Sequence, residues 1–172
     1  MARSIAFVTY NTVGDSLSSG WHESGDRRAL VLQNTYGLKW GSDAVLGREA
    51  RNLADVVLSQ AERVATGASH LRGEIGNLWE QLQQALLELD HVVVYVGNRG
   101  SEYVIELAAQ LPADKVTFVA CDCGLTYKEA LIERAGLAAS ELVLSECGGH
   151  RAMRRLFNSF MATGELRARV PA

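Results

Sequence analysis

Short apolar runs alternate with helical patterns in the back half of the chain, and this alternation constrains the fold more than any other feature. The runs are HVVVYV at 91–96, KVTFVA at 115–120 and ELVLSE at 141–146. The first is rich in β-branched residues and continuously apolar, which is typical of a strand buried on both faces of a parallel sheet. Strands that alternate with helices predict βαβ units with right-handed crossovers. We expect residues 92–96, 116–119 and 142–144 to be fully buried, parallel and adjacent in one sheet.

Apolar residues at helical spacing follow each of these runs. EYVIELAAQL follows the first run and ends at Pro112, and TYKEALIERAGL follows the second with Gly136 at a C-cap position. HRAMRRLFNSFMATG follows the third, and its apolar stripe consists of Met153, Leu156, Phe157, Phe160 and Met161. We therefore predict that 91–163 forms a regular βαβαβα half.

The front half is less regular. SIAFVTY at 4–10 predicts a strand of the same sheet, RALVLQN at 28–34 is a candidate for a further strand, and 11–41 holds five glycines without a strong period. Two amphipathic helical patterns follow within 43–89, which predicts a helical hairpin insertion. The expected fold is one α/β domain over 1–172, a three-layer Rossmann-like or flavodoxin-like fold with a mainly parallel sheet.

Composition narrows the class of protein. The 172 residues, 48% of them hydrophobic and 22% charged, suit one soluble globular domain with a sizeable core. The sequence lacks an apolar run of about 18 residues, so no membrane helix is expected. Three cysteines are an odd number, and two of them are separated by one residue. A set of intrachain disulfides is therefore not expected, and a reducing cytoplasm is the predicted location.

Charge is unevenly placed along the chain. The net charge of −3 argues against a generic nucleic-acid binder, yet five arginines and one acid lie between residue 150 and the end. This basic segment is either a solvated helix face or a local site for an anionic ligand or partner.

Polar or glycine-containing turns follow four of the predicted strands. These turns are YNTVGDS at 10–16, GNRGS at 97–101, CDCGLT at 121–126 and ECGGH at 146–150. Ligands of open parallel sheets bind outside the carboxyl ends of the strands, where the positive ends of helices point. The turns therefore predict binding of a phosphate-bearing small molecule, with a nucleotide as the first candidate. None of them is a G-x-G-x-x-G or Walker A loop, so NAD and ATP are not assigned.

In architecture the chain resembles the Rossmann-like sensor domains and ring nucleases associated with CRISPR systems. The resemblance implies a homodimer that binds a cyclic oligoadenylate at this edge, with or without cleavage. Arg151 or Arg154 would then neutralise phosphate. The residues that would meet the ligand are Tyr10, Asn11, Thr12, Asn98, Arg99 and Ser101.

The cysteines support a different class of function. If the strands at 115–120 and 141–146 are neighbours, the thiols and one imidazole gather at one edge, and three Cys with one His is a known zinc set. The candidate metal ligands are Cys121, Cys123, Cys147 and His150. A C-x-C pair that continues a strand points its sulfurs to opposite faces, so this site requires a bend, which Gly124 allows.

Two further alternatives remain open. In a thiol-dependent enzyme, Cys147 at a helix start would be the nucleophile and His150 the base, oriented by Asp122 or Glu146. Otherwise the cysteines are small buried apolar residues. A non-catalytic interaction protein that assembles through the helices of 43–89 is the third class, so the sequence does not decide whether the protein is an enzyme.

Overall fold

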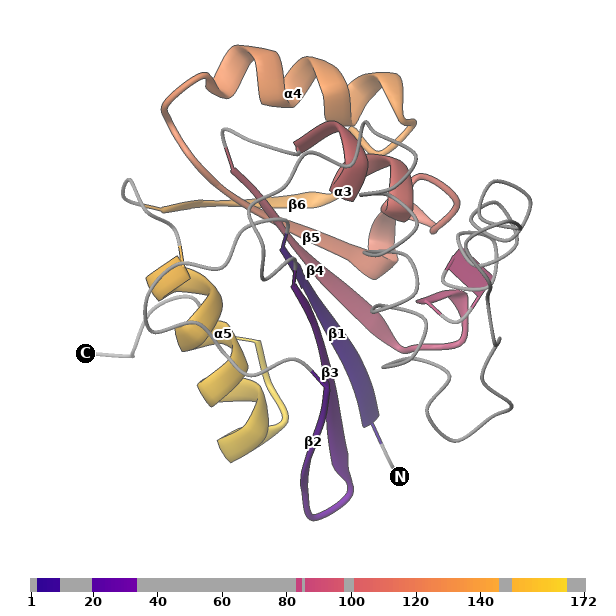
Figure 1. The fold of residues 1–172 in the computed structure, drawn as a ribbon, viewed down its shortest axis with the longest axis vertical. Coiled ribbons are helices and arrows are strands. Elements are labelled where there is room, and N and C mark those ends of the chain that lie inside the picture. The colour runs from indigo at the N-terminus through magenta and orange to yellow at the C-terminus, as the bar shows by residue number, and fades with distance from the viewer. Residues whose placement is uncertain are drawn as a thin grey trace, which may run out of the picture.

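A six-stranded, mostly parallel sheet forms the centre of the molecule in the computed structural model (Figure 1). The structure describes residues 3–9, 20–33, 83–84, 86–97, 101–145 and 150–166. The strand order is β2-β3-β1-β4-β5-β6. The strands are β1 (Arg3–Thr9), β2 (Gly20–Ser24), β3 (Arg27–Gln33), β4 (His91–Val96), β5 (Val116–Cys121) and β6 (Glu141–Ser145).

Parallel pairing joins five of the six strands. β1 pairs with β3 and β4, β4 pairs with β5, and β5 pairs with β6, all in parallel. The predicted strands are thus confirmed, with boundaries that shift by at most one residue. The antiparallel strand β2 was not predicted, and it pairs with β3 through a two-residue turn. Gly25 begins this turn with φ 61°, a conformation that glycine adopts without steric cost.

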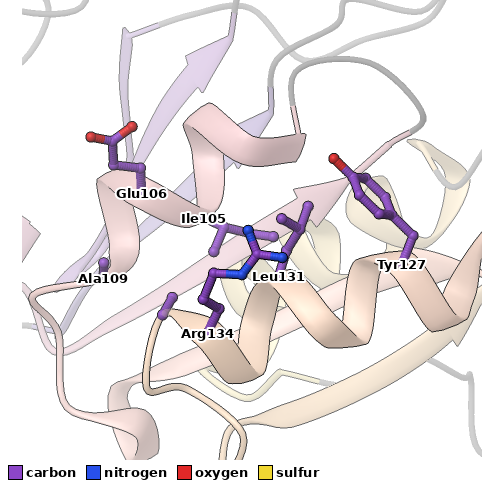
Figure 2. A pocket seen from close by; sticks show the side chains of 7 residues that line it. Ile105, Glu106, Ala109, Tyr127, Leu131 and Arg134 are labelled. Atoms are coloured by element: carbon purple, nitrogen blue, oxygen red, sulfur yellow. The ribbon is translucent and has the colours of Figure 1, made fainter.

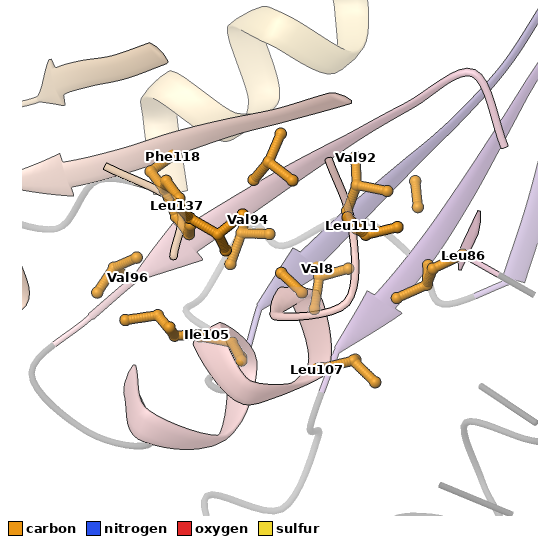
Figure 3. Close-up of a cluster of buried hydrophobic side chains, with 14 of the residues drawn as sticks. Val8, Leu86, Val92, Val94, Val96, Ile105, Leu107, Leu111, Phe118 and Leu137 are labelled. Carbon is orange, nitrogen blue, oxygen red and sulfur yellow. The ribbon is translucent and has the colours of Figure 1, made fainter. Parts of the chain in front are cut away.

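Two apolar layers cover the two faces of the sheet. Side chains alternate in direction along each strand, so Val92, Val94 and Val96 of β4 face one layer while Val93 and Tyr95 face the other. All five are buried, as the continuous apolar run predicted. Figure 3 shows the first layer, in which β4 and β5 pack against the helix that follows β4.

Among the described residues, three helices supply most of the other half of these layers. α3 (Ser101–Ala108) and α4 (Leu125–Arg134) pack in the first layer, and α5 (His150–Thr163) packs in the second. The short 3-10 helix η2 (Ala113–Lys115) precedes β5. α4 ends as its sequence predicted: Gly136 has φ 78°, and its N–H donates to the carbonyl of Glu133 at 2.9 Å. The N–H of Leu137 donates to Ile132 at 3.0 Å, which completes a Schellman cap.

The expectation that residues 142–144 are fully buried is wrong. β6 is the edge strand of the sheet, and the side chain of Leu144 is 57% exposed. A central strand has neighbours on both sides, whereas β6 has only β5 in the described sheet, so its apolar pattern is less completely covered.

The predicted helical hairpin of 43–89 lies outside the described residues except for 83–84 and 86–89, of which 83–84 and 86–87 are helical. Among the described helices, none has both the length and the apolar character needed to cross a bilayer.

Candidate functional site

The carboxyl ends of all five parallel strands lie at one edge of the sheet. These ends are Thr9, Gln33, Val96, Cys121 and Ser145. The register aligns them closely, because Thr9 lies opposite Gln33 and Cys121 lies opposite Ser145. This carboxyl edge is the place where the sequence predicted a ligand.

A topological switch point lies between β1 and β4. The next strand parallel to β1 along the chain, β3, lies on one side of β1, whereas β4, β5 and β6 extend on the other side. Val8 of β1 lies opposite Val94 of β4, so these two strands end side by side. Crevices at such points are the usual ligand sites of open parallel sheets.

Most of the predicted ligand residues come shortly after β1 or β4 in the sequence, and these are the two strands that flank the switch point. Tyr10, Asn11 and Thr12 directly follow β1, and Asn98 and Arg99 follow β4 after the buried Gly97. These five ligand candidates lie outside the described residues. Ser101 begins α3.

Helix α5 runs antiparallel to β1 and β3. Its last carbonyls accept hydrogen bonds from Arg27, which begins β3, and the carbonyl of Gly164 just beyond accepts one from Arg3, which begins β1. The 14 residues of α5 span about 21 Å, close to the length of a seven-residue strand. Its amino-terminal end, with the exposed Arg151 and Arg154 in the first two turns, therefore points towards the carboxyl edge.

The thiol of Cys121 has an unexpected neighbour at the same edge. The Nζ atom of Lys128 donates a hydrogen bond to the Sγ atom of Cys121 at 3.5 Å. Both side chains are buried, with only 2% of Lys128 and 3% of Cys121 exposed, whereas Cys123 is exposed. An amine and a thiol therefore meet where water is nearly excluded.

The environment of Cys121 favours its thiolate. Burial by itself raises the pKa of the thiol, but hydrogen bonds from the backbone N–H of Cys123 and the amine of Lys128 lower it, as does the positive charge of that amine. The side chain of Cys123 adds a further hydrogen bond. The net effect is a pKa for Cys121 below the ordinary value of a cysteine.

The bend required of the C-x-C pair is present. β5 ends at Cys121, the next residues form a turn, and Gly124 adopts φ 63° before α4 begins. The side chains of Cys121 and Cys123 therefore interact instead of pointing to opposite faces of the sheet.

The structure describes the side chains of only two of the four residues in the predicted metal or thiol centre, Cys121 and Cys123. Cys147 lies outside the described residues, and the side chain of His150 does too, although His150 begins α5. Within the described residues, no group of three potential metal ligands occurs.

Lys128 was not among the residues predicted from the sequence, although a signal for it exists. It lies three residues after Leu125 and three before Leu131, so it occupies the apolar stripe of α4. Lysine on the core side of a helix requires a polar partner inside the protein. The nearest candidate along the chain is the C-x-C segment that precedes the helix.

A separate groove of about 410 Å³ lies between α3 and α4 (Figure 2). Ile105 and Leu131 contribute apolar surface, and the guanidinium of Arg134 extends over them, with Glu106 and Tyr127 at the two ends of the view. None of the predicted site residues that the structure describes lines this groove.

Comparison of the chain with protein-family models, with curated proteins and with solved structures gives no match. Function therefore has to be inferred from the site itself.

Proposed function

We propose that the protein binds a phosphate-bearing small molecule, a nucleotide, at the carboxyl edge of the sheet between β1 and β4. The strand order carries this proposal, because the chain leaves β1 and β4 towards opposite sides and the two strands end side by side. In a Rossmann-like fold the crevice at such a point receives the ligand.

The charge distribution supports an anionic ligand. α3, α4 and α5 each follow a parallel strand, so each presents the positive end of its dipole to this edge. Arg151 and Arg154 add positive charge in the first turns of α5. In the proposal, Arg99 forms a bidentate contact with phosphate, and the remaining contacts come from Tyr10, Asn11, Thr12, Asn98 and Ser101.

Within this class we propose a cyclic oligoadenylate as the ligand. We propose that a homodimer binds it in the cytoplasm. Its support is the architectural resemblance to CRISPR-associated sensor domains and ring nucleases, which is an analogy of fold. The proposal covers binding, and cleavage of the ligand is a separate question that the same experiment answers.

Calorimetric titration of the purified protein tests the proposal. The ligands are cyclic tetra-adenylate, cyclic hexa-adenylate, AMP and ATP, and the products are examined by chromatography for cleavage. Arg99→Ala should weaken binding by about 10- to 150-fold, which corresponds to about 1.5–3 kcal/mol for a hydrogen bond to a charged group.

Arg134→Ala is the matched control. Arg134 is exposed in the last turn of α4, at the opposite end of that helix from the carboxyl edge, so its loss should leave affinity unchanged. The nucleotide proposal is wrong if none of the four ligands binds the wild type. Equal affinities of wild type and Arg99→Ala would remove Arg99 from the site.

A metal- or thiol-dependent enzyme is a second candidate, favoured by the convergence of Cys121 and Cys123 at the same edge. The proposed centre adds Cys147 and His150, either as zinc ligands or as nucleophile and base. Elemental analysis of the purified protein tests the metal form, which requires about one zinc ion per chain. An unchanged zinc content of Cys147→Ser would contradict the metal form, and an unchanged catalytic rate would contradict the thiol form.

A further inference from the structure

A buried amine next to a buried thiol has an energetic cost that constrains both groups. An ammonium ion that leaves water without a partner loses several kcal/mol of solvation free energy. Within the described residues, the hydrogen-bond partner of the Lys128 amine is the sulfur of Cys121, and a thiolate there supplies the opposite charge. The contact therefore places a hydrogen-bond donor and a positive charge against the buried sulfur of Cys121.

The two sulfurs of the C-x-C turn differ in their access to solvent. Cys121 is 3% exposed, so a bulky reagent does not reach it, whereas Cys123 is exposed. Both are thiols in the structure, and their side chains interact. One sulfur can therefore meet a solute while the other can react only with its neighbour.

We propose that Cys121, Cys123 and Lys128 form a thiol–disulfide switch that reacts with small-molecule disulfides such as oxidised glutathione. The exposed thiolate of Cys123 attacks one sulfur of the glutathione disulfide, forms a mixed disulfide and expels one glutathione thiolate. The thiolate of Cys121 then attacks the Cys123 sulfur, forms the Cys121–Cys123 disulfide and expels the second glutathione thiolate. Two protein thiols are oxidised and one glutathione disulfide is reduced to two thiols.

Local structure favours the second step. Cys121 is the last residue of β5, and residues 122–124 belong to neither β5 nor α4, so closure of the ring involves the end of one strand and the turn that follows it. Lys128 stabilises the attacking thiolate in the reduced state, and its role is to activate Cys121 rather than to bind the oxidant.

Trypsin provides a direct readout. Cleavage after Lys115 and Lys128 releases the peptide 116–128, which contains Cys121 and Cys123 but not Cys147. The folded protein is incubated with mixtures of oxidised and reduced glutathione, quenched with acid, alkylated and digested. We expect the wild-type peptide to lack the two thiol hydrogens and to resist alkylation.

Single-cysteine variants test the order of the two steps. Cys121→Ser should accumulate glutathione on Cys123, whereas Cys123→Ser should leave Cys121 unmodified in the folded protein. Arg134→Ala, an exposed position at the far end of α4, is the control and should form the 116–128 disulfide like the wild type. Rapid glutathionylation of Cys121 in Cys123→Ser would overturn the proposed order.

A lysine variant tests the activating role. Lys128→Met should slow closure of the mixed disulfide about tenfold at neutral pH, because exchange proceeds through the thiolate. This substitution removes the trypsin site at residue 128, so the two cysteines of the variant are followed in the peptide 116–134. Circular dichroism checks that the variant is folded, and Lys128→Arg, which keeps the positive charge, should restore much of the rate. Closure of Lys128→Met at the wild-type rate would overturn the activating role.

The switch as a whole is overturned if the wild-type 116–128 peptide stays reduced in oxidising glutathione, or if a stoichiometric zinc ion protects both thiols. These results do not depend on nucleotide binding, so the switch and the proposed function fail or succeed separately.

Discussion

Thr117 of β5 lies against His91 of β4, with the threonine Oγ1 2.8 Å from the histidine Nε2. Thr117 also donates to Glu141 of β6 at 3.5 Å, so a polar chain crosses three strands at the amino edge of the sheet. The sequence offered no partner for His91. The neighbouring strand β5 supplies the partner Thr117, and β6 supplies Glu141 to Thr117, which explains how a half-buried histidine on β4 is accommodated.

The first prediction is that His91 makes stability depend on pH. Burial lowers the pKa of His91 below its ordinary value of 6.5, and the charge of Arg3 lowers it further, against the opposing effect of Glu141 and Asp114. At a pH below 6.5 the unfolded chain gains a proton that the native state does not, so the free energy of unfolding falls until the pH reaches the native pKa.

Urea unfolding at several pH values measures this dependence, and His91→Gln should flatten it between pH 6.5 and the native pKa. His22 provides a comparison, since its ring packs edge-on against Phe157 and a His22→Gln variant should keep the dependence that is due to His91. Identical pH profiles for wild type and His91→Gln would contradict the prediction.

The second prediction concerns the titration of Cys121. In a Cys123→Ser, Cys147→Ser background, the ultraviolet absorbance of the thiolate should appear at lower pH in the folded protein than in urea, and Lys128→Met should shift the midpoint upwards. Because the native pKa is depressed, the pair stabilises the fold at pH values above the unfolded pKa. This stabilisation is lost as the pH falls through the native pKa. Equal midpoints for the folded and unfolded protein would refute this assignment.

The third prediction concerns the turn before α4. Gly124 has φ 63°, and a Cβ atom built there meets nothing within 4 Å, so any cost of a side chain comes from the backbone alone. Gly124→Ala should lower the free energy of unfolding by about 1–2 kcal/mol. Gly124→Asn should cost less, because asparagine tolerates the left-handed conformation. Denaturant unfolding measures both, and an unchanged stability of Gly124→Ala would show that the turn relaxes.

The fourth prediction concerns the end of α5. Arg27 donates from Nε and Nη2 to the carbonyl of Met161, at 3.1 and 2.8 Å, in a partly buried contact. These bonds satisfy a carbonyl that the helix leaves unpaired and place positive charge at the negative end of its dipole. Arg27→Met should therefore cost about 1–2 kcal/mol in the free energy of unfolding.

Arg154→Met is the control on the same helix. Arg154 is exposed, so its loss should change stability by less than about 0.5 kcal/mol. Equal effects of the two substitutions in urea would show that the contact of Arg27 with α5 contributes nothing specific.

Part of the fold was readable from local pattern. The apolar runs at 91–96 and 115–120 predicted strands buried on both faces, and the helical spacing after them predicted α3 and α4. β2 was missed because GWHES has little periodicity, although Gly25 and Asp26 form a dipeptide typical of two-residue hairpins. A search for that turn between two short strands would have found it.

Local pattern was enough to predict the five parallel strands, the three helices that follow β4, β5 and β6, and the polar segments after these strands, because side-chain periodicity and turn chemistry act over a few residues. Tertiary structure alone decided that β6 lies at the edge, that β1 and β4 end side by side, and that Lys128 meets Cys121. The order of strands depends on which apolar faces pack together over long separations. The environment of a lysine depends on everything that surrounds its helix. The local spacing of residues encodes neither the order of the strands nor this environment.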